Sequence, residues 1–154
     1  MDNNENKDLM REISETVTLA FKVQEEYLKQ GPFPELSLTE VHVIEAVSKE
    51  SFPTMSNVAK RLQVTVGTLT TNVKSIIKKG FLTKETYEKD HRFIILRITS
   101  KGYEALHYHD TFHASLSKLY SEKMTPEEMK WVYEMFGIVR SGLLEYHNKI
   151  HEKK

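Results

Sequence analysis

Residues 65–80 read TVGTLTTNVKSIIKKG and have the pattern of a short amphipathic helix. Thr65 is a good N-cap residue, and Gly80 stands where helices commonly end in the left-handed conformation. The apolar side chains that recur on one helical face are Leu69, Val73, Ile76 and Ile77. The opposite face is polar and cationic, so the sequence predicts a helix over residues 66–79 with one buried and one solvent-facing side.

A β-hairpin is predicted directly after this helix. The sequence period changes to that of strands over residues 81–87 and 92–99, and residues 88–91 form a charged tip between them. The apolar positions that alternate along the second strand are Ile94, Leu96 and Ile98. Two short strands around a charged turn are expected to project from the rest of the molecule.

Two further helices are predicted before residue 65. Ser37 and Glu40 have the form of a capping box, and Thr54 is a good N-cap for a third, short helix. A helix, a short helix, a turn, a polar-faced helix and a hairpin form the order of a winged helix-turn-helix. In that fold the polar face enters the major groove of DNA, and the apolar face fixes the angle of the helix. The sequence therefore predicts a DNA-binding region over residues 36–99, although an ordinary amphipathic surface helix would give the same local pattern.

Both ends of the chain are predicted to form long helices, over residues 5–29, 100–121 and 126–151. These helices carry more apolar surface than a three-helix core with a hairpin can cover, and an uncovered apolar stripe promotes aggregation. We therefore expect a mainly α fold with a small β-hairpin wing, in which residues 1–35 and 100–154 form the dimerisation region of a homodimer.

Composition restricts the class of protein. A chain of 154 residues can form one compact unit with a core. The absence of cysteine excludes disulfides, thiolate metal sites and cysteine nucleophiles. The polar, acidic first residues and the lack of a long apolar run favour a cytoplasmic protein that does not bind a membrane.

The formal net charge is zero, but the charges are segregated along the chain. Lys and Arg against Asp and Glu number 5 to 11 in residues 1–59, 8 to 3 in residues 60–92, and 9 to 8 in residues 93–154. The middle segment therefore carries 8 − 3 = +5. A charge run alone is usually a solvated face. Together with the helix and hairpin it favours duplex DNA, whose condensed counterions are released where cations meet phosphates.

The residues from about Leu36 to Tyr120 resemble the MarR family of bacterial regulators. The most specific match is the wing, Asp90-His91-Arg92-Phe93-Ile94-Ile95-Leu96-Arg97-Ile98-Thr99, followed by Lys101-Gly102. The resemblance implies a repressor that binds a pseudo-palindromic operator as a homodimer, with Arg92, supported by Asp90, entering the minor groove. The candidate DNA-binding residues are Thr65, Thr68, Thr70, Thr71, Asn72, Lys74, Lys78, Lys89, Asp90, His91 and Arg92.

Within the family, residues 65–80 and the pair His109 and His113 around Phe112 are similar to the FabT-like branch. That branch represses fatty-acid synthesis genes with long-chain acyl-acyl carrier protein as co-repressor, so the resemblance implies an acyl effector. The candidate effector-pocket residues are Phe21, Tyr27, His42, Tyr108, His109, Phe112 and His113. Aromatic side chains at helical spacing are, however, more often core residues than a ligand site.

The histidines leave a second possibility open, a zinc-responsive regulator. His109 and His113 lie four residues apart on one helical face, and such a pair can chelate zinc with His42 as a third ligand. A fourth ligand is not evident, because Gln24 is a poor substitute for a carboxylate in the first helix. A hydrogen-bonded core, a polar pocket lining and a zinc site remain as three interpretations, and no other cofactor is expected.

Two other classes of function are weighed against DNA binding. A small metal-dependent hydrolase would use His42, His109 and His113, but the sequence has no HExxH motif, nucleophile elbow or phosphate loop, so an enzyme is not expected. A winged helix that binds protein should be apolar at the centre of its exposed helix face. Thr70, Thr71 and Lys74 are hydrogen-bonding or charged instead, which favours DNA.

Overall fold

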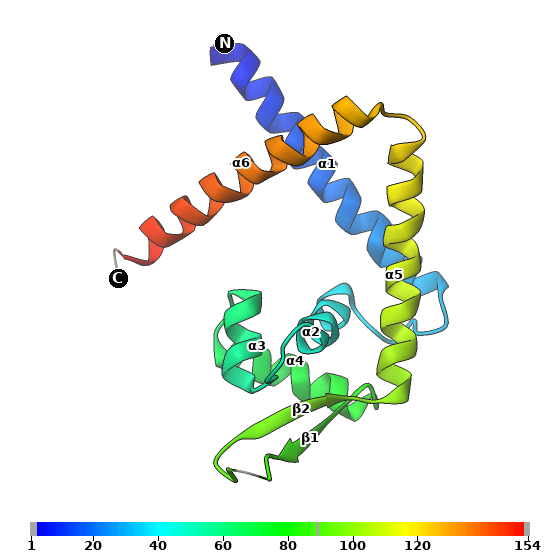
Figure 1. Ribbon diagram of the computed structural model, residues 1–154, viewed down its shortest axis with the longest axis vertical. Coiled ribbons are helices and arrows are strands. Elements are labelled where there is room, and N and C mark those ends of the chain that lie inside the picture. Colours follow the sequence, from blue (N-terminus) through cyan, green and yellow to red (C-terminus); the bar gives the residue numbers. More distant parts are fainter. Residues whose placement is uncertain (1–2, 89, 153–154) are drawn as a thin grey trace. The chain divides into compact units, whose positions relative to one another are not determined.

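The computed structural model describes residues 3–88 and 90–152 (Figure 1). In chain order, the elements of this part are α1 (Asn3–Gln30), α2 (Leu38–Ser48), α3 (Met55–Leu62), α4 (Val66–Lys78), β1 (Leu82–Thr86), β2 (Ile94–Ile98), α5 (Ser100–Ser121) and α6 (Pro126–His151). Helix, short helix, helix and hairpin follow one another as in a winged helix-turn-helix, so the predicted fold class is confirmed.

Side-chain caps set where the helices begin. The hydroxyl of Ser37 accepts a hydrogen bond from the backbone N–H of Glu40, and the Glu40 carboxylate accepts from the Ser37 N–H, which completes a capping box at α2. Thr125 and Glu128 form the same box at α6. Thr54 and Thr65 cap α3 and α4 through their hydroxyls. These caps satisfy backbone donors that a helix leaves without intrahelical partners, and those at Ser37, Thr54 and Thr65 confirm the sequence-based predictions.

The two strands form an antiparallel pair in which Leu82 lies opposite Ile98. The predicted alternation along β2 is wrong at its start, because Ile94 is 49% exposed whereas Ile95 is 3% exposed. The segment before α3 accounts for the difference. Thr54 forms a bridge with Ile95, and the Leu96 N–H donates to the Pro53 carbonyl at 2.9 Å, so the middle of β2 has neighbours on both edges.

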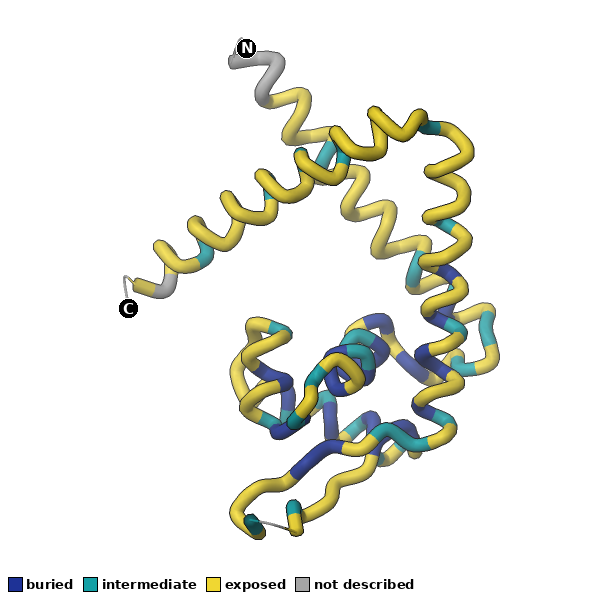
Figure 2. Tube along the Cα trace, in the orientation of Figure 1, coloured by how far each residue is buried: buried dark blue, intermediate teal, exposed yellow. Residues whose placement is uncertain are grey.

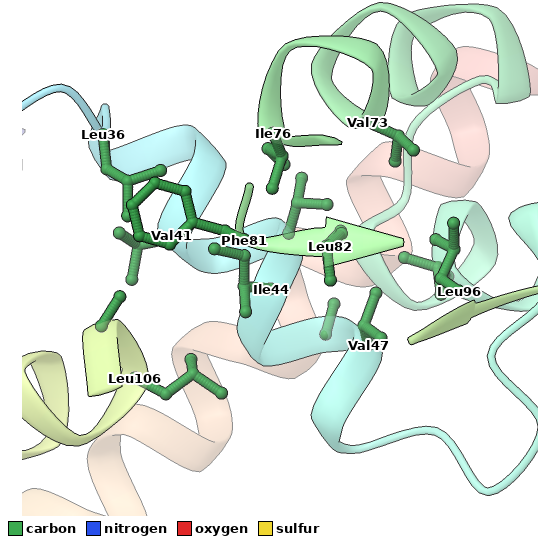
Figure 3. Packing of buried hydrophobic residues seen from close by; sticks show 14 of the residues in the cluster. Leu36, Val41, Ile44, Val47, Val73, Ile76, Phe81, Leu82, Leu96 and Leu106 are labelled. Atoms are coloured by element: carbon green, nitrogen blue, oxygen red, sulfur yellow. The ribbon is translucent and has the colours of Figure 1, made fainter. Parts of the chain in front are cut away.

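The core lies among α2, α3, α4, the hairpin and the first half of α5, with Leu28 contributed by α1. Figure 3 shows side chains of α4, the hairpin and α5 packing against those of α2, and Figure 2 shows the buried residues concentrated there. Its fully buried members include Val41, Ile44, Leu69, Val73, Ile76, Phe81, Leu82 and Leu96. Because Leu69, Val73 and Ile76 of α4 are buried in this core, α4 is held with its polar side outward.

The chain divides into two compact units, Met1–Phe112 and His113–Lys154, with the boundary inside α5. The second unit contains the remainder of α5 and α6. Large apolar side chains are exposed along α6, and they include Trp131, Tyr133, Phe136, Ile138 and Leu143. The exposed apolar residues of α1 include Leu9, Val17 and Phe21. Among the described helices, none combines the length and the apolar character needed to cross a membrane.

Candidate nucleic-acid interface

The outward face of α4 is built on three buried residues, Leu69, Val73 and Ile76. The hydroxyl of Thr65 accepts a hydrogen bond from the Thr68 N–H at 3.1 Å and lies 2.9 Å from the Thr68 hydroxyl. These contacts fix the first turn and leave both threonines exposed. The exposed row that continues from them along the helix is Thr71, Lys74 and Lys78.

Two residues of α4 that the sequence predicts to contact DNA, Thr70 and Asn72, do not belong to this exposed row. Thr70 is half-buried, and its hydroxyl donates to the Val66 carbonyl at 2.7 Å. Asn72 is also half-buried. Lys74 and Lys78, in contrast, are exposed, and neither belongs to an ion pair among the described residues. The cationic row at Lys74 and Lys78 is therefore the part of α4 best placed to meet phosphates.

A buried carboxylate holds the C-terminal end of α4 against α2. Both carboxylate oxygens of Glu40 accept hydrogen bonds from Lys79 Nζ, at 2.7 and 2.6 Å, and Oε1 also accepts from the Ser75 hydroxyl at 2.7 Å. Burial acts to raise the pKa of Glu40, but the hydrogen bonds from Lys79, Ser37 and Ser75 outweigh it and keep the pKa below its ordinary value. Glu40 therefore remains a carboxylate that fixes the angle of α4.

The tip of the wing presents Arg92 on an acidic support. The Asp90 carboxylate accepts hydrogen bonds from Arg92 Nε at 2.9 Å, from Nη2 at 2.7 Å and from the backbone N–H at 3.1 Å. The hydrogen bonds from Arg92 lower the pKa of Asp90, and the same pairing raises the pKa of Arg92. The Arg92 side chain is 85% exposed, so its charge faces solvent. His91 is exposed as well, and Lys89 lies outside the described residues.

A tight corner joins the end of α4, the hairpin and α5. Thr99 donates its hydroxyl proton to the Gly80 carbonyl at 2.8 Å and accepts from the Gly102 N–H at 3.0 Å. A Cβ on Gly102 would collide with the Phe81 carbonyl oxygen and lie 2.7 Å from Ile98 Cγ2. Only glycine fits this corner without a backbone shift, so Gly102 sets how closely α5 approaches the wing.

A histidine cluster lies on the other side of α2. His42 and His109 meet at a ring-centroid separation of 5.5 Å, and Glu45 joins them, with one ligand atom from each residue within 4.8 Å of the others. His109 is 1% exposed. The pKa of Glu45 lies below its ordinary value. Burial acts to raise this pKa, but the hydrogen bond and charge of Lys49, together with the nearby His109 and His42, outweigh the effect of burial. The described cluster thus pairs His42 and His109 with Glu45, a residue that the sequence did not single out, whereas His113 begins the second unit.

The predicted effector residues of α1 and α5 pack on one another. The Tyr27 ring stacks on Tyr108 at 4.6 Å and lies 4.9 Å from Phe112. The Tyr108 hydroxyl donates to the Tyr27 carbonyl at 3.2 Å, and a Cβ on Gly31 would collide with the Tyr108 ring. Phe21 is 52% exposed. The structure therefore brings Tyr27, Tyr108 and Phe112 together, and His109 follows Tyr108 in the sequence of α5.

Sequence reasoning missed the contact of Glu40 with Lys79 and the place of Glu45 beside the histidines. The capping-box pattern identifies Glu40 as a cap, but its partners Ser75 and Lys79 are 35 and 39 residues away. Glu45 follows His42 by three residues on α2, and this helical spacing is the signal that could have joined it to the histidines.

Comparison with known proteins gives three findings. No protein-family model matches the chain. The transcriptional regulator AdcR of Streptococcus pneumoniae is 30% identical over 98 residues, which cover 62% of this chain and 66% of AdcR, just under two thirds of that relative. The solved structure of Streptococcus pneumoniae FabT in complex with DNA matches with a TM-score of 0.86 and 25% identity, over 92% of this chain and 99% of that one.

A MarR/EmrR family transcriptional regulator from Acinetobacter shares the fold, with a TM-score of 0.73 and 15% identity over 91% of this chain and 97% of that one. AdcR and the Acinetobacter protein are named as transcriptional regulators, and FabT was solved in complex with DNA, so these matches give no support to the hydrolase alternative. The wing sequence, the order of elements and these similarities agree, and the chain has the winged helix-turn-helix fold of MarR-type transcriptional regulators, to which it is similar in sequence and in structure.

Proposed function

We propose that this chain is a transcriptional regulator of the MarR family, which binds duplex DNA sequence-specifically and represses transcription. The observation that carries the proposal is the pairing, within one compact unit, of the exposed α4 face with the Asp90-supported Arg92 of the wing. The major groove admits one helix, and an arginine can enter the adjacent minor groove. The structural similarity to FabT, solved in complex with DNA, supports the same mode of docking.

The contacts divide by chemistry. Thr65, Thr68 and Thr71 offer hydroxyls near the N-terminal end of α4, where base edges and phosphates can both be reached. Lys74 and Lys78 would meet phosphates and release counterions. Thr70, Asn72, Lys89 and His91 complete the proposed set.

The proposed functional unit is a homodimer. Residues 36–99 would form the DNA-binding region, and residues 1–35 and 100–154 the dimerisation region. The exposed apolar side chains of α1 and α6 support this assignment, because a monomer rarely leaves so many of them in contact with water. Two copies would place two α4 helices about one DNA turn apart on a pseudo-palindrome.

The proposed target genes are those of fatty-acid synthesis, and the proposed effector is a long-chain acyl-acyl carrier protein. The similarity to FabT over most of both chains supports this assignment. The packed aromatic group of Tyr27, Tyr108 and Phe112 beside His109 supports an apolar effector, because an acyl chain could be received by rearrangement of these rings.

Titration of metal-free protein into labelled duplexes tests both the proposed target genes and the proposed effector. One duplex carries a fatty-acid-synthesis promoter and the other its scrambled sequence, each with and without long-chain acyl-acyl carrier protein. Tighter, promoter-specific binding with the acylated carrier is expected, and unacylated carrier is the control. Specific binding that is indifferent to the carrier would contradict the effector, and no preference over the scrambled duplex would contradict the promoter assignment.

The histidine cluster favours a second candidate, a zinc-responsive regulator. His42, Glu45 and His109 supply two imidazoles and a carboxylate, which are donors that Zn²⁺ accepts, and their ligand atoms are close enough to share one ion. Bound zinc would supply a positive charge that links α2 to α5.

Isothermal titration of the metal-free protein with Zn²⁺ tests this candidate. The wild-type chain is expected to bind zinc stoichiometrically, and His109→Ala and Glu45→Gln are expected to weaken binding. His107→Ala is the matched control, because His107 is exposed on the same helix. Equal zinc binding by all four proteins would exclude the cluster as the site.

A further inference from the structure

Phe52 connects the loop between α2 and α3 to both strands of the wing. Its ring meets the Tyr87 ring edge-on at 5.0 Å and 78°, and the Phe93 ring at 5.7 Å and 73°. Tyr87 follows β1 and Phe93 precedes β2, and the Tyr87 N–H donates to the Phe93 carbonyl at 2.9 Å. Phe52 therefore packs on the pair of residues from which the wing tip projects.

The tip beyond this pair is a hydrogen-bonded unit. The Asp90 N–H donates to the Tyr87 carbonyl at 3.2 Å, and the Phe93 N–H donates to the Asp90 carbonyl at 3.1 Å. Asp90 in turn holds the Arg92 guanidinium. The orientation of the Tyr87 and Phe93 pair thus sets the direction in which Arg92 points.

The loop that carries Phe52 is anchored on the helix-turn-helix side. The Asn57 side-chain amide donates to the Phe52 carbonyl at 2.9 Å, and Thr54 caps α3. The Pro53 carbonyl accepts from Leu96 at the base of the wing. Phe52 extends this support outward from residue 96 to residue 93, so it couples α3 to the outer part of the hairpin.

We propose that Phe52 is a positioning residue for DNA binding, whose ring holds the wing at the tilt that brings Arg92 to the minor groove while α4 occupies the major groove. The inference rests on the proposed DNA-binding function. Without the ring, Arg92 and Asp90 keep their chemistry, but the wing must be ordered during binding, and this ordering lowers the affinity.

The test is a double-mutant cycle on a labelled duplex selected in vitro with the wild-type protein. The four proteins are wild type, Phe52→Ala, Arg92→Ala and the double variant, and Phe52→Trp tests rescue by another aromatic ring. Phe33→Ala is the matched control, because Phe33 is half-buried and meets Phe81 edge-on at 5.7 Å, at the base of the hairpin rather than at the Tyr87 and Phe93 pair. Hydrogen exchange at the Tyr87 and Phe93 amides, measured without DNA, reports wing order independently.

Phe52→Ala is expected to weaken binding about tenfold, a change of about 1.4 kcal/mol. The double variant should bind no more weakly than Arg92→Ala, Phe52→Trp should recover most of the affinity, and wing exchange should rise in Phe52→Ala but not in Phe33→Ala. If Arg92→Ala is weakened but Phe52→Ala is not, or if the two effects add, the role of Phe52 is wrong while the proposed docking stands. If Arg92→Ala binds like wild type, the wing docking itself is wrong and the role of Phe52 fails with it.

Discussion

Lys79 Nζ lies 2.6 Å from Glu40 Oε2, and this ion pair joins the first turn of α2 to the residue that ends α4. Glu40 is 6% exposed, so its charge depends on the partners that the fold supplies. A buried ion pair is weak evidence for stability as such, but removing one member leaves the other without compensation. The pair therefore restricts how α4 can be oriented, and the outward face of α4 depends on it.

Replacement of Glu40 by Gln should destabilise the fold by about 2 kcal/mol, because a hydrogen bond to a charged group is replaced by a neutral one. Chemical denaturation of the metal-free protein measures the change. Glu85→Gln is the control, since its ion pair with Arg97 is exposed and surface pairs contribute about 0–1 kcal/mol. Equal stability of the two variants would show that the Glu40 network does not hold α4.

Replacement of Gly102 by Ala should cost about 1–3 kcal/mol, the usual range for overpacking a well-filled site. The new methyl group would meet the Phe81 carbonyl, which is backbone and cannot rotate away. Thermal unfolding provides the measurement. Gly67→Ala is the control, because the nearest atom to its added Cβ is Thr65 Oγ1 at 3.7 Å, an ordinary contact. A melting temperature for Gly102→Ala as high as that of Gly67→Ala would contradict the close approach of α5.

A charge introduced at Phe136 should dissociate the proposed homodimer. Phe136 is 56% exposed in the single chain and belongs to the apolar stripe of α6. Burying an unpaired carboxylate there is unfavourable, so Phe136→Glu is expected to sediment as a monomer and to lose most of its affinity for a two-half-site operator. Phe93→Glu changes an exposed aromatic residue of the wing, outside residues 1–35 and 100–154, and should remain dimeric. A Phe136→Glu dimer as stable as wild type would exclude this face.

Local sequence patterns predicted the elements well because caps and periodicity act over a few residues. Ser37, Thr54, Thr65 and Thr125 each begin a helix through a contact three residues away. The hairpin and its charged tip were predicted for the same reason. Burial along β2 was less predictable, because Ile95 is covered through its neighbour Thr54, which is distant in sequence.

The candidate sites show the same division between local and distant contacts. Asp90 and Arg92 are two residues apart, and their pairing follows from the wing motif. The cluster of His42, Glu45 and His109, in contrast, depends on how α5 packs on α2. Phe52 could not be assigned to the wing from the sequence, because its ring contacts lie 35 and 41 residues further along the chain.

The most direct test of the central claim is the salt dependence of binding to the selected duplex for wild type, Lys74→Ala and Arg92→Ala. If Lys74 meets a phosphate, its loss should reduce the slope of log K against log salt by about one. Arg92→Ala should weaken binding markedly, whereas Lys130→Ala, an exposed lysine of α6, should leave both slope and affinity unchanged. Wild-type slope and affinity in both Lys74→Ala and Arg92→Ala would contradict the docking of α4 and the wing on DNA.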